Sequence, residues 1–213
     1  DTISKIRQMK KEGEHISLRQ NPLSVDLEKM REGGCTLQTF AIYVNWKEVP
    51  DAAEAAKDIL NIFRQEMDQN ADMISQIITY SQLEENIKAG RMSALLSLEE
   101  GAIYQESPDT LRWFWEQGAR MATLTWNYEN DLGYPNCMGD PFTQRIWSWG
   151  EERGLKEKGL QFLEELEHLH MLVDVSHLSD GGFWDVARHA TRPFLASHSN
   201  ARGLVKGAAR NLT

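Results

Sequence analysis

The 213-residue sequence lacks any run of about 18 apolar residues, the length that a membrane-spanning helix requires. It has 23 basic and 32 acidic residues, a net charge of −9, and its basic residues form no continuous stripe. We therefore expect neither a nucleic-acid partner nor a place within a membrane. No secretory leader pattern is visible, but the sequence opens abruptly on Asp1, so we expect the natural start to lie upstream.

Cysteine and glycine motifs are also missing. Cys35 and Cys137 are too far apart to form a CxxC motif, which favours two free thiols in a reducing, cytoplasmic compartment. No glycine-rich phosphate loop of the G-x-G-x-x-G or Walker type occurs, so nothing indicates a nucleotide site. No low-complexity tract, repeat or linker divides the chain. We therefore expect a single domain over residues 1–213.

What the sequence does contain is an alternation of short apolar segments and amphipathic ones. Apolar runs predict strands at 35–44, 92–99, 121–126, 171–177 and 193–198. Apolar residues at helical spacing predict helices at 52–70, 109–118, 155–170 and 178–190. Strands that are apolar on both faces and separated by helices indicate a parallel α/β sheet, either open or closed as a (β/α)8 barrel. A complete barrel needs about 250 residues, so this chain would hold only part of one.

Polar side chains follow the predicted strands at their carboxyl ends, which gather on one face of a parallel barrel. Glu99, His177 and His198 stand at three such ends, and Asp1 could be the end of a further strand. This mixture of nitrogen and oxygen donors suits zinc or another divalent transition metal. A lone histidine at a strand end more often only forms hydrogen bonds, but two of them with a glutamate favour a metal site. Asp174 either orients a ligand imidazole or is a buried, hydrogen-bonded carboxylate.

The segment 127–154 is long for the connection between a strand and the following helix. Connections above about 12–15 residues are usually functional or disordered, and the aromatic content of this one argues against disorder. We therefore expect it to form a lid or a pocket wall over the metal face.

Several motifs resemble those of one enzyme family. The segments LLSLEEG, TLTWNYEND, DVSHLSD and PFLASHSNAR are similar to those of the membrane (renal) dipeptidase family of zinc metallopeptidases, and in particular of its bacterial members. The resemblance runs over most of the chain, from Asp1 to Thr213. It implies a TIM-type (β/α)8 barrel of the metal-dependent hydrolase kind, incomplete at both ends, with about six of its strands present. It also implies a dipeptide substrate and makes a homodimer a reasonable expectation.

The resemblance assigns metal ligands residue by residue. It implies two zinc ions, or other divalent metals, in each active site. Asp1 would bind one ion together with a histidine two residues before the start of this chain. Glu99 would bridge the ions, and His177 and His198 would bind the second. Glu100 stands where many members have glycine, which leaves an ambiguity; we choose Glu99 because it completes the predicted strand LLSLE.

The resemblance also implies substrate contacts and a reaction. Arg210 matches the arginine that binds the substrate carboxylate. We also expect Trp126 and Asn127 to bind the substrate. Trp126 stands where many members have a histidine that contacts the substrate, so the substrate range is open. We expect a binuclear zinc dipeptidase in which Glu99 helps to hold the metals that activate a bridging water for peptide hydrolysis. The alternatives are another metal-dependent amidohydrolase on the same scaffold and an inactive, incomplete barrel.

Overall fold

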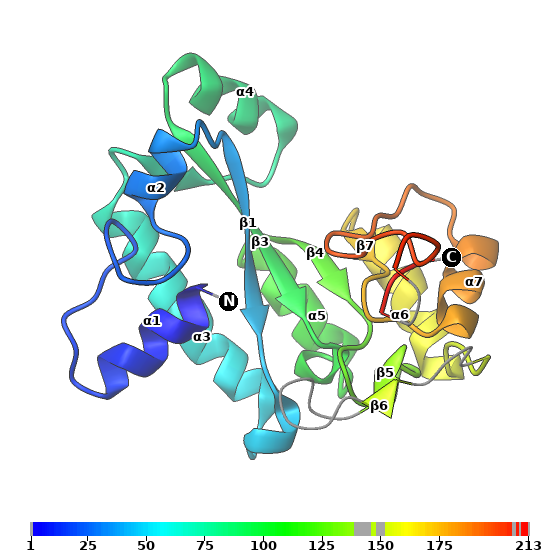
Figure 1. Ribbon diagram of the computed structural model, residues 1–213. Helices are drawn as coiled ribbons and strands as arrows, with labels where there is room; N and C mark the ends of the chain where they lie inside the picture. The colour runs from blue at the N-terminus through cyan, green and yellow to red at the C-terminus, as the bar shows by residue number, and fades with distance from the viewer. Residues whose placement is uncertain (1, 139–145, 148–151, 206–207, 209, 213) are drawn as a thin grey trace. The chain divides into compact units, whose positions relative to one another are not determined.

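The structure is a computed structural model, and it describes residues 2–138, 146–147, 152–205, 208 and 210–212 (Figure 1). The chain divides into two compact units, Asp1–Ser97 with Glu116–Arg120, and Leu98–Trp115 with Met121–Thr213. One sheet has the strand order β1 (Leu37–Tyr43), β3 (Met92–Glu99), β4 (Ala119–Thr123) and β7 (Leu172–Asp174), with β2 (Ile74–Gln76) also paired to β3. The parallel α/β architecture expected from the sequence is confirmed. The single domain stays a prediction.

The first unit holds most of the amino-terminal helices and strands. They are α1 (Thr2–Lys11), α2 (Leu27–Glu32), β1 (Leu37–Tyr43), η1 (Trp46–Glu48), α3 (Ala52–Gln69), β2 (Ile74–Gln76), α4 (Tyr80–Lys88) and most of β3 (Met92–Glu99). β2 pairs with β3 in parallel, with Ile74 opposite Met92. Both faces of β3 are buried, as is typical of a central strand in a parallel sheet.

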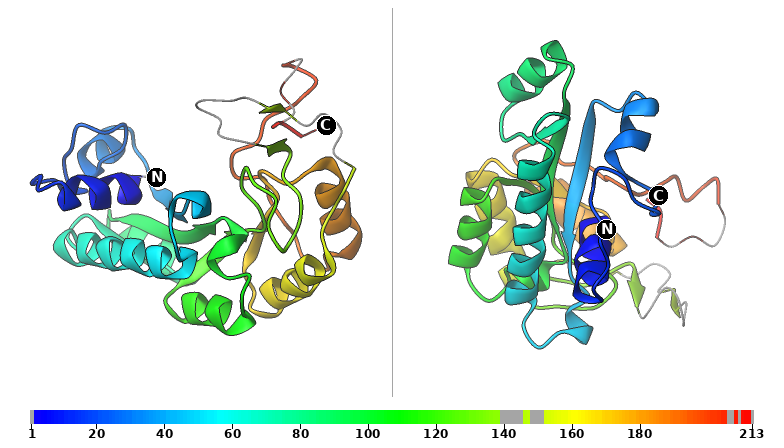
Figure 2. Two further views of the ribbon diagram at one scale, coloured as in Figure 1. Left: turned by 90° about the horizontal axis from the view of Figure 1, so that it is seen from below. Right: turned by 90° about the vertical axis from the view of Figure 1, so that its left-hand side faces the viewer.

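α3 shows how the sequence produces the layers of this unit. Asp51 caps its first turn by accepting a 2.9 Å hydrogen bond from the backbone N–H of Glu54. Ile59 and Phe63 recur at helical spacing and are buried, and the Phe63 ring lies 5.8 Å from that of Phe40 on β1. α1 and α3 both pack along β1 (Figure 2). The apolar face of α3 therefore covers the sheet.

The second unit carries the remaining elements. They are η2 (Gly101–Ile103), most of α5 (Pro108–Glu116), most of β4 (Ala119–Thr123), β5 (Cys137–Met138), β6 (Ile146–Trp147), α6 (Glu157–His168), β7 (Leu172–Asp174) and α7 (Asp180–His189). β4 and β7 pair in parallel, with Thr123 opposite Asp174, and α6 packs against β7. β5 and β6 form an antiparallel pair within the long segment 127–154. Among the residues that the structure describes, no helix has the length and apolar character needed to cross a bilayer.

Some predicted elements are shifted or shortened. β4 begins at Ala119, directly after Gly118 with φ +96°, and ends at Thr123, so Trp126 follows in a loop. The expected strand 193–198 is reduced to a single bridge between Leu195 and Asp174, because the chain turns at residues 197–198. α1, α2, β2 and α4 were not expected. The three-residue β2 is too short for periodicity to reveal it. Asp1, expected at the end of a further strand, lies outside the described residues.

Candidate metal centre

Glu99 is the last residue of β3, and its carboxylate is directed at two imidazoles. Its Oε1 lies 3.3 Å from Nε2 of His177 and 3.4 Å from Nε2 of His198. The side chain of Glu99 is only 14% exposed, so its charge has little access to water. The buried strand β3 fixes its backbone, which makes Glu99 a rigidly placed ligand donor.

Glu100 turns the other way. Its backbone has φ +101°, and its fully buried carboxylate accepts hydrogen bonds from the backbone N–H groups of Ala102 (2.9 Å) and Trp126 (3.2 Å). Nδ2 of Asn130 donates a third, at 2.6 Å. Glu100 therefore anchors the loop after β4, whereas Glu99 faces the histidines. The structure thus places the two neighbouring glutamates in different surroundings.

His177 lies in a turn just after β7. The strand ends at Asp174, and His177 adopts the left-handed conformation with φ +72°. Such a conformation costs a non-glycine residue roughly 1–3 kcal/mol and persists where the surroundings hold it. Here the backbone N–H of Asn136 donates to the carbonyl oxygen of His177 at 2.8 Å. The imidazole itself is buried, with its Nδ1 3.0 Å from Oδ1 of Asn127 and its ring 6.1 Å from that of Trp126.

His198 lies in the turn at residues 197–198, and its ring meets that of His177. The two Nε2 atoms are 2.9 Å apart, and the ring centroids are 4.9 Å apart. Its other nitrogen, Nδ1, lies 2.6 Å from Oγ of Ser197. Each imidazole therefore has an oxygen acceptor at Nδ1 and presents Nε2 towards Glu99.

The donor set fits a metal ion. Oγ of Ser197 donates to Asp174, so the Nδ1 of His198 is the donor in its contact with this hydroxyl, and Nδ1 of His177 donates to the carboxamide oxygen of Asn127. With these tautomers both Nε2 atoms offer lone pairs beside a carboxylate oxygen, an arrangement that could hold a metal ion. Zinc bonds of about 2.0–2.1 Å at tetrahedral angles separate their ligand atoms by roughly 3.3 Å. The observed separations of 2.9, 3.3 and 3.4 Å are close to that value.

Burial and mutual contacts set the pKa values of His177 and Glu99. Burial lowers the pKa of His177 to about 4, although the contact with Glu99 acts in the opposite direction, and the charge of Arg210 lowers it further. Burial acts to raise the pKa of Glu99, but its contacts with His177 and His198 outweigh burial and hold this pKa well below the usual range. At neutral pH the site therefore offers a neutral imidazole and an ionised carboxylate, which are the forms that bind metals.

Of the other expected site residues, Trp126, Asn127 and Arg210 lie near this triad of Glu99, His177 and His198. Arg210 acts on His177 through its charge, and its carbonyl oxygen accepts a 3.1 Å hydrogen bond from Nδ2 of Asn136. Asn136 therefore ties the Arg210 segment to the turn of His177. Asn127 contacts His177, so its predicted role in substrate binding stays a prediction. Asp1, the expected ligand of the other metal, lies outside the described residues.

Sequence reasoning missed Ser197, Asn136 and the anchoring role of Glu100. A signal for Ser197 was present, because serine precedes histidine in both VSH and ASH, but the pattern does not say which serine meets a ring. The structure answers that question, since Oγ of Ser197 contacts the imidazole whereas Oγ of Ser176 accepts the backbone N–H of His198.

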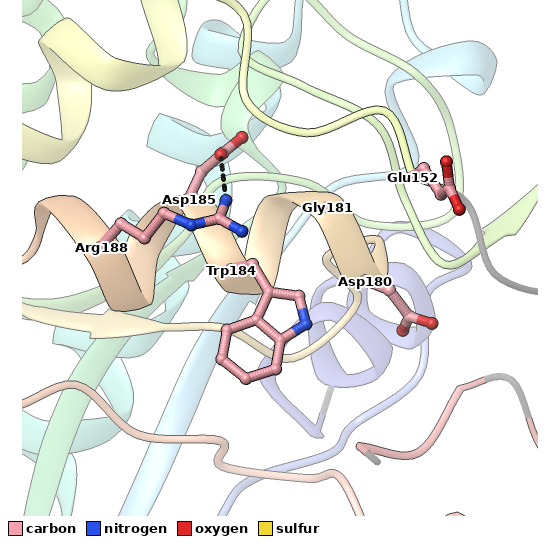
Figure 3. Close-up of a pocket in the computed structure, with 6 residues that line it drawn as sticks. All are labelled: Glu152, Asp180, Gly181, Trp184, Asp185 and Arg188. Carbon is pink, nitrogen blue, oxygen red and sulfur yellow. Dashed lines mark hydrogen bonds and ion pairs between the residues drawn. The ribbon is translucent and has the colours of Figure 1, made fainter.

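A separate pocket of about 370 Å³ lies along α7 and is lined by Glu152, Asp180, Gly181, Trp184, Asp185 and Arg188 (Figure 3). Arg188 pairs with Asp185 at 3.5 Å, and Arg202 forms two hydrogen bonds to the carboxylate of Asp180. None of the three triad residues lines this pocket. Its acidic groups are largely committed to these arginines, so it is not the metal centre.

Comparison with known proteins points to one enzyme family. The family model of membrane dipeptidase, peptidase family M19, matches residues 1–213. The chain belongs to this family. The family resemblance seen in the sequence is thereby confirmed.

Individual relatives cover the chain to different extents. An uncharacterized protein of Klebsiella pneumoniae is 32% identical over 61% of this chain and 46% of its own length. A dipeptidase of Aspergillus oryzae, aclJ, is 25% identical over 84% of this chain and 43% of its own length. The chain thus spans less than half of either relative.

Solved structures of the family have the same fold. A metallopeptidase of family M19, dipeptidase AC, matches with a TM-score of 0.83 and 26% identity over 100% of this chain and 64% of its own. A Rhodobacter sphaeroides metallopeptidase, solved with a phosphinate mimic of the dipeptide L-Ala-D-Ala, matches with a TM-score of 0.82 and 23% identity over 100% of this chain and 66% of its own. The described elements are therefore part of the TIM-barrel-like fold of M19 dipeptidases, with only part of the barrel present.

Proposed function

We propose that this chain carries the central part of the active site of a zinc-dependent dipeptidase. The observation that carries the proposal is the convergence of two imidazole Nε2 atoms and one carboxylate oxygen, with both Nδ1 atoms held by other acceptors. Membership of the membrane dipeptidase family supplies the substrate class. The dipeptidase relatives support the same reaction.

In this proposal Glu99, His177 and His198 would hold zinc, and Glu99 and Asp1 would help to hold a second ion. Bound zinc would supply Lewis-acid polarisation of the scissile carbonyl and activation of the attacking water. The chain's own residues set the geometry. Asn127 keeps Nε2 of His177 free for the metal by accepting from Nδ1, and β3 holds Glu99 against both rings.

Arg210 would select the substrate. Its guanidinium presents a fork of N–H donors that matches a carboxylate and forms two parallel hydrogen bonds with it. The charge of Arg210 already acts on His177, so a carboxylate bound there would lie close to the metal centre. A free carboxylate bound by Arg210 would place the bond before the last residue of the substrate at the metal centre, as hydrolysis of a dipeptide requires.

Trp126 favours a second candidate, another metal-dependent amide hydrolase on the same scaffold. Its indole packs 6.1 Å from the His177 ring and presents an aromatic wall where the family resemblance implies a histidine. A panel of dipeptides, N-acyl amino acids and cyclic amides separates the two candidates. Hydrolysis confined to substrates other than dipeptides would favour the second.

The test of the metal site is zinc content and dipeptide hydrolysis in the full-length protein. His198→Ala removes a half-exposed ligand, so we expect loss of zinc and of activity with little loss of stability. His189→Ala, at the exposed end of α7, is the matched control and should retain both properties. Full zinc occupancy and full activity in His198→Ala would refute the proposal.

A further inference from the structure

The two histidines of the triad are held in different ways. The side chain of His177 is 8% exposed and packs beside Trp126 and Asn127. The side chain of His198 is 45% exposed, so packing alone does not fix its ring. A ligand that is free to rotate loses conformational entropy when it binds a metal, which lowers affinity. Something other than packing must hold His198 in its binding orientation.

Ser197 makes the contact that replaces packing. Its Oγ lies 2.6 Å from Nδ1 of His198 and donates its own proton to Oδ2 of Asp174. The hydroxyl thus accepts a hydrogen bond from Nδ1–H of His198 and donates one to the carboxylate of Asp174, so all the donors in this hydrogen-bond relay point the same way. This direction leaves Nε2 of His198 without a proton and aimed at Glu99.

Asp174 is held in a fixed position and anchors this hydrogen-bond relay. It is 1% exposed at the end of β7, and its Oδ1 accepts the backbone N–H groups of Ser176 and Ser197, each at 3.0 Å. Neighbouring side chains point to opposite faces of a strand, so Ser197 could not reach His198 within one. The turn at residues 197–198 brings them to the same side.

We propose that Ser197, anchored by Asp174, is a positioning residue that locks the ring orientation and tautomer of His198 for metal binding. This inference rests on the proposed metal site. Hydrogen-bonding partners of ligand imidazoles typically contribute 10–100-fold in metal affinity. Because the His198 side chain is half-exposed and packing supports its ring only in part, we expect the effect of removing the Ser197 hydroxyl to fall in that range.

The test is the Zn²⁺ dissociation constant of the full-length protein, measured by competition with a chromophoric chelator. Ser197→Ala should weaken zinc binding about 10–100-fold, and Ser197→Thr, which keeps the hydroxyl, should restore it. Ser199→Ala is the matched control, because Oγ of Ser199 donates to the carbonyl oxygen of Arg210 and touches no imidazole of the triad. Nitrogen NMR of the metal-free protein should show one His198 tautomer in the wild type and a mixture in Ser197→Ala.

The outcomes separate this inference from the proposed function. Zinc binding by the wild type with unchanged affinity and tautomer in Ser197→Ala overturns the role of Ser197 and leaves the metal site standing. Equal weakening in Ser197→Ala, Ser197→Thr and Ser199→Ala also overturns it, because that pattern reports general disturbance of the segment. Absence of zinc binding in the wild type overturns the proposed function and this inference with it.

Discussion

Exchanging Glu99 or Glu100 for glutamine tests the centre of the site, because the two residues are adjacent in sequence and differ in surroundings. Glu99→Gln removes the negative charge that faces both imidazoles. Loss of a hydrogen-bonding partner outside the ligand set already costs about 10–100-fold in metal affinity, so loss of this charged ligand should cost more than about 100-fold. Glu100→Gln leaves all three ligands in place, and its zinc affinity should stay close to that of the wild type.

The stability of Glu100→Gln follows from two opposing effects. Burial raises the pKa of Glu100 from 4.5 to about 7, so the charged form costs roughly 3 kcal/mol more in the folded protein than in water. Glutamine removes that cost. The NH₂ group of glutamine, however, cannot accept the hydrogen bond that the buried backbone N–H of Trp126 donates to Glu100. The loss of this hydrogen bond costs about 1–3 kcal/mol of stability. The two effects nearly cancel, so Glu100→Gln should fold and serve as the matched control.

Isothermal titration with Zn²⁺ and thermal unfolding in chelator measure both quantities. We expect Glu99→Gln to lose zinc binding and Glu100→Gln to retain it, with a change in melting temperature of no more than about 8 °C, since 1 kcal/mol corresponds to about 2–4 °C for a chain of this size. Loss of zinc in Glu100→Gln with retention in Glu99→Gln would show that the two glutamates have been assigned the wrong way round. Retention of zinc in both variants would show that neither glutamate is a zinc ligand.

Three further changes test separate parts of the reasoning. Asn127→Ala leaves Nδ1–H of buried His177 without its acceptor and should weaken zinc binding about 10–100-fold. Asn127→Asp keeps an acceptor and is the control. Equal zinc affinities of the two variants in a chelator competition would contradict this prediction. Arg210→Lys replaces a contact with two parallel hydrogen bonds by a point charge, so it should raise KM for dipeptides more than it lowers kcat in steady-state assays. An unchanged KM would show that Arg210 does not bind the substrate. Burial acts to raise the pKa of Asp26, but hydrogen bonds from Lys29 and Asn21 outweigh burial and lower it, so its contribution to stability is present above about pH 4 and lost as pH falls. Asp26→Asn should therefore flatten the acid limb of the stability curve in urea titrations, and an unaltered limb would show that Asp26 does not contribute there.

Long, strongly patterned segments of the fold were predictable. β3 was predicted with its observed bounds, because its eight consecutive residues are largely apolar. This composition fits a strand whose two faces are both buried. α3 was predicted to within a residue from its apolar periodicity. β2, with three residues, gives no periodic signal, and its strand conformation depends on pairing with β3. The expected strand at 193–198 failed because turn geometry at residues 197–198 overrides an apolar run.

Local patterns and motifs encode the alternation of strands and helices, the family resemblance and the residue types of the candidate centre, so these could be predicted from the sequence. The folded structure was needed to show that Glu99 rather than Glu100 faces the histidines. It was also needed to show that Asn127 contacts Nδ1 of His177 and that Ser197 contacts Nδ1 of His198. The reason is physical: a motif fixes which donors are near in sequence, but the direction of a side chain depends on backbone turns such as φ +72° at His177. Those turns are held by hydrogen bonds from segments distant in the chain, including the one that Asn136 donates to His177.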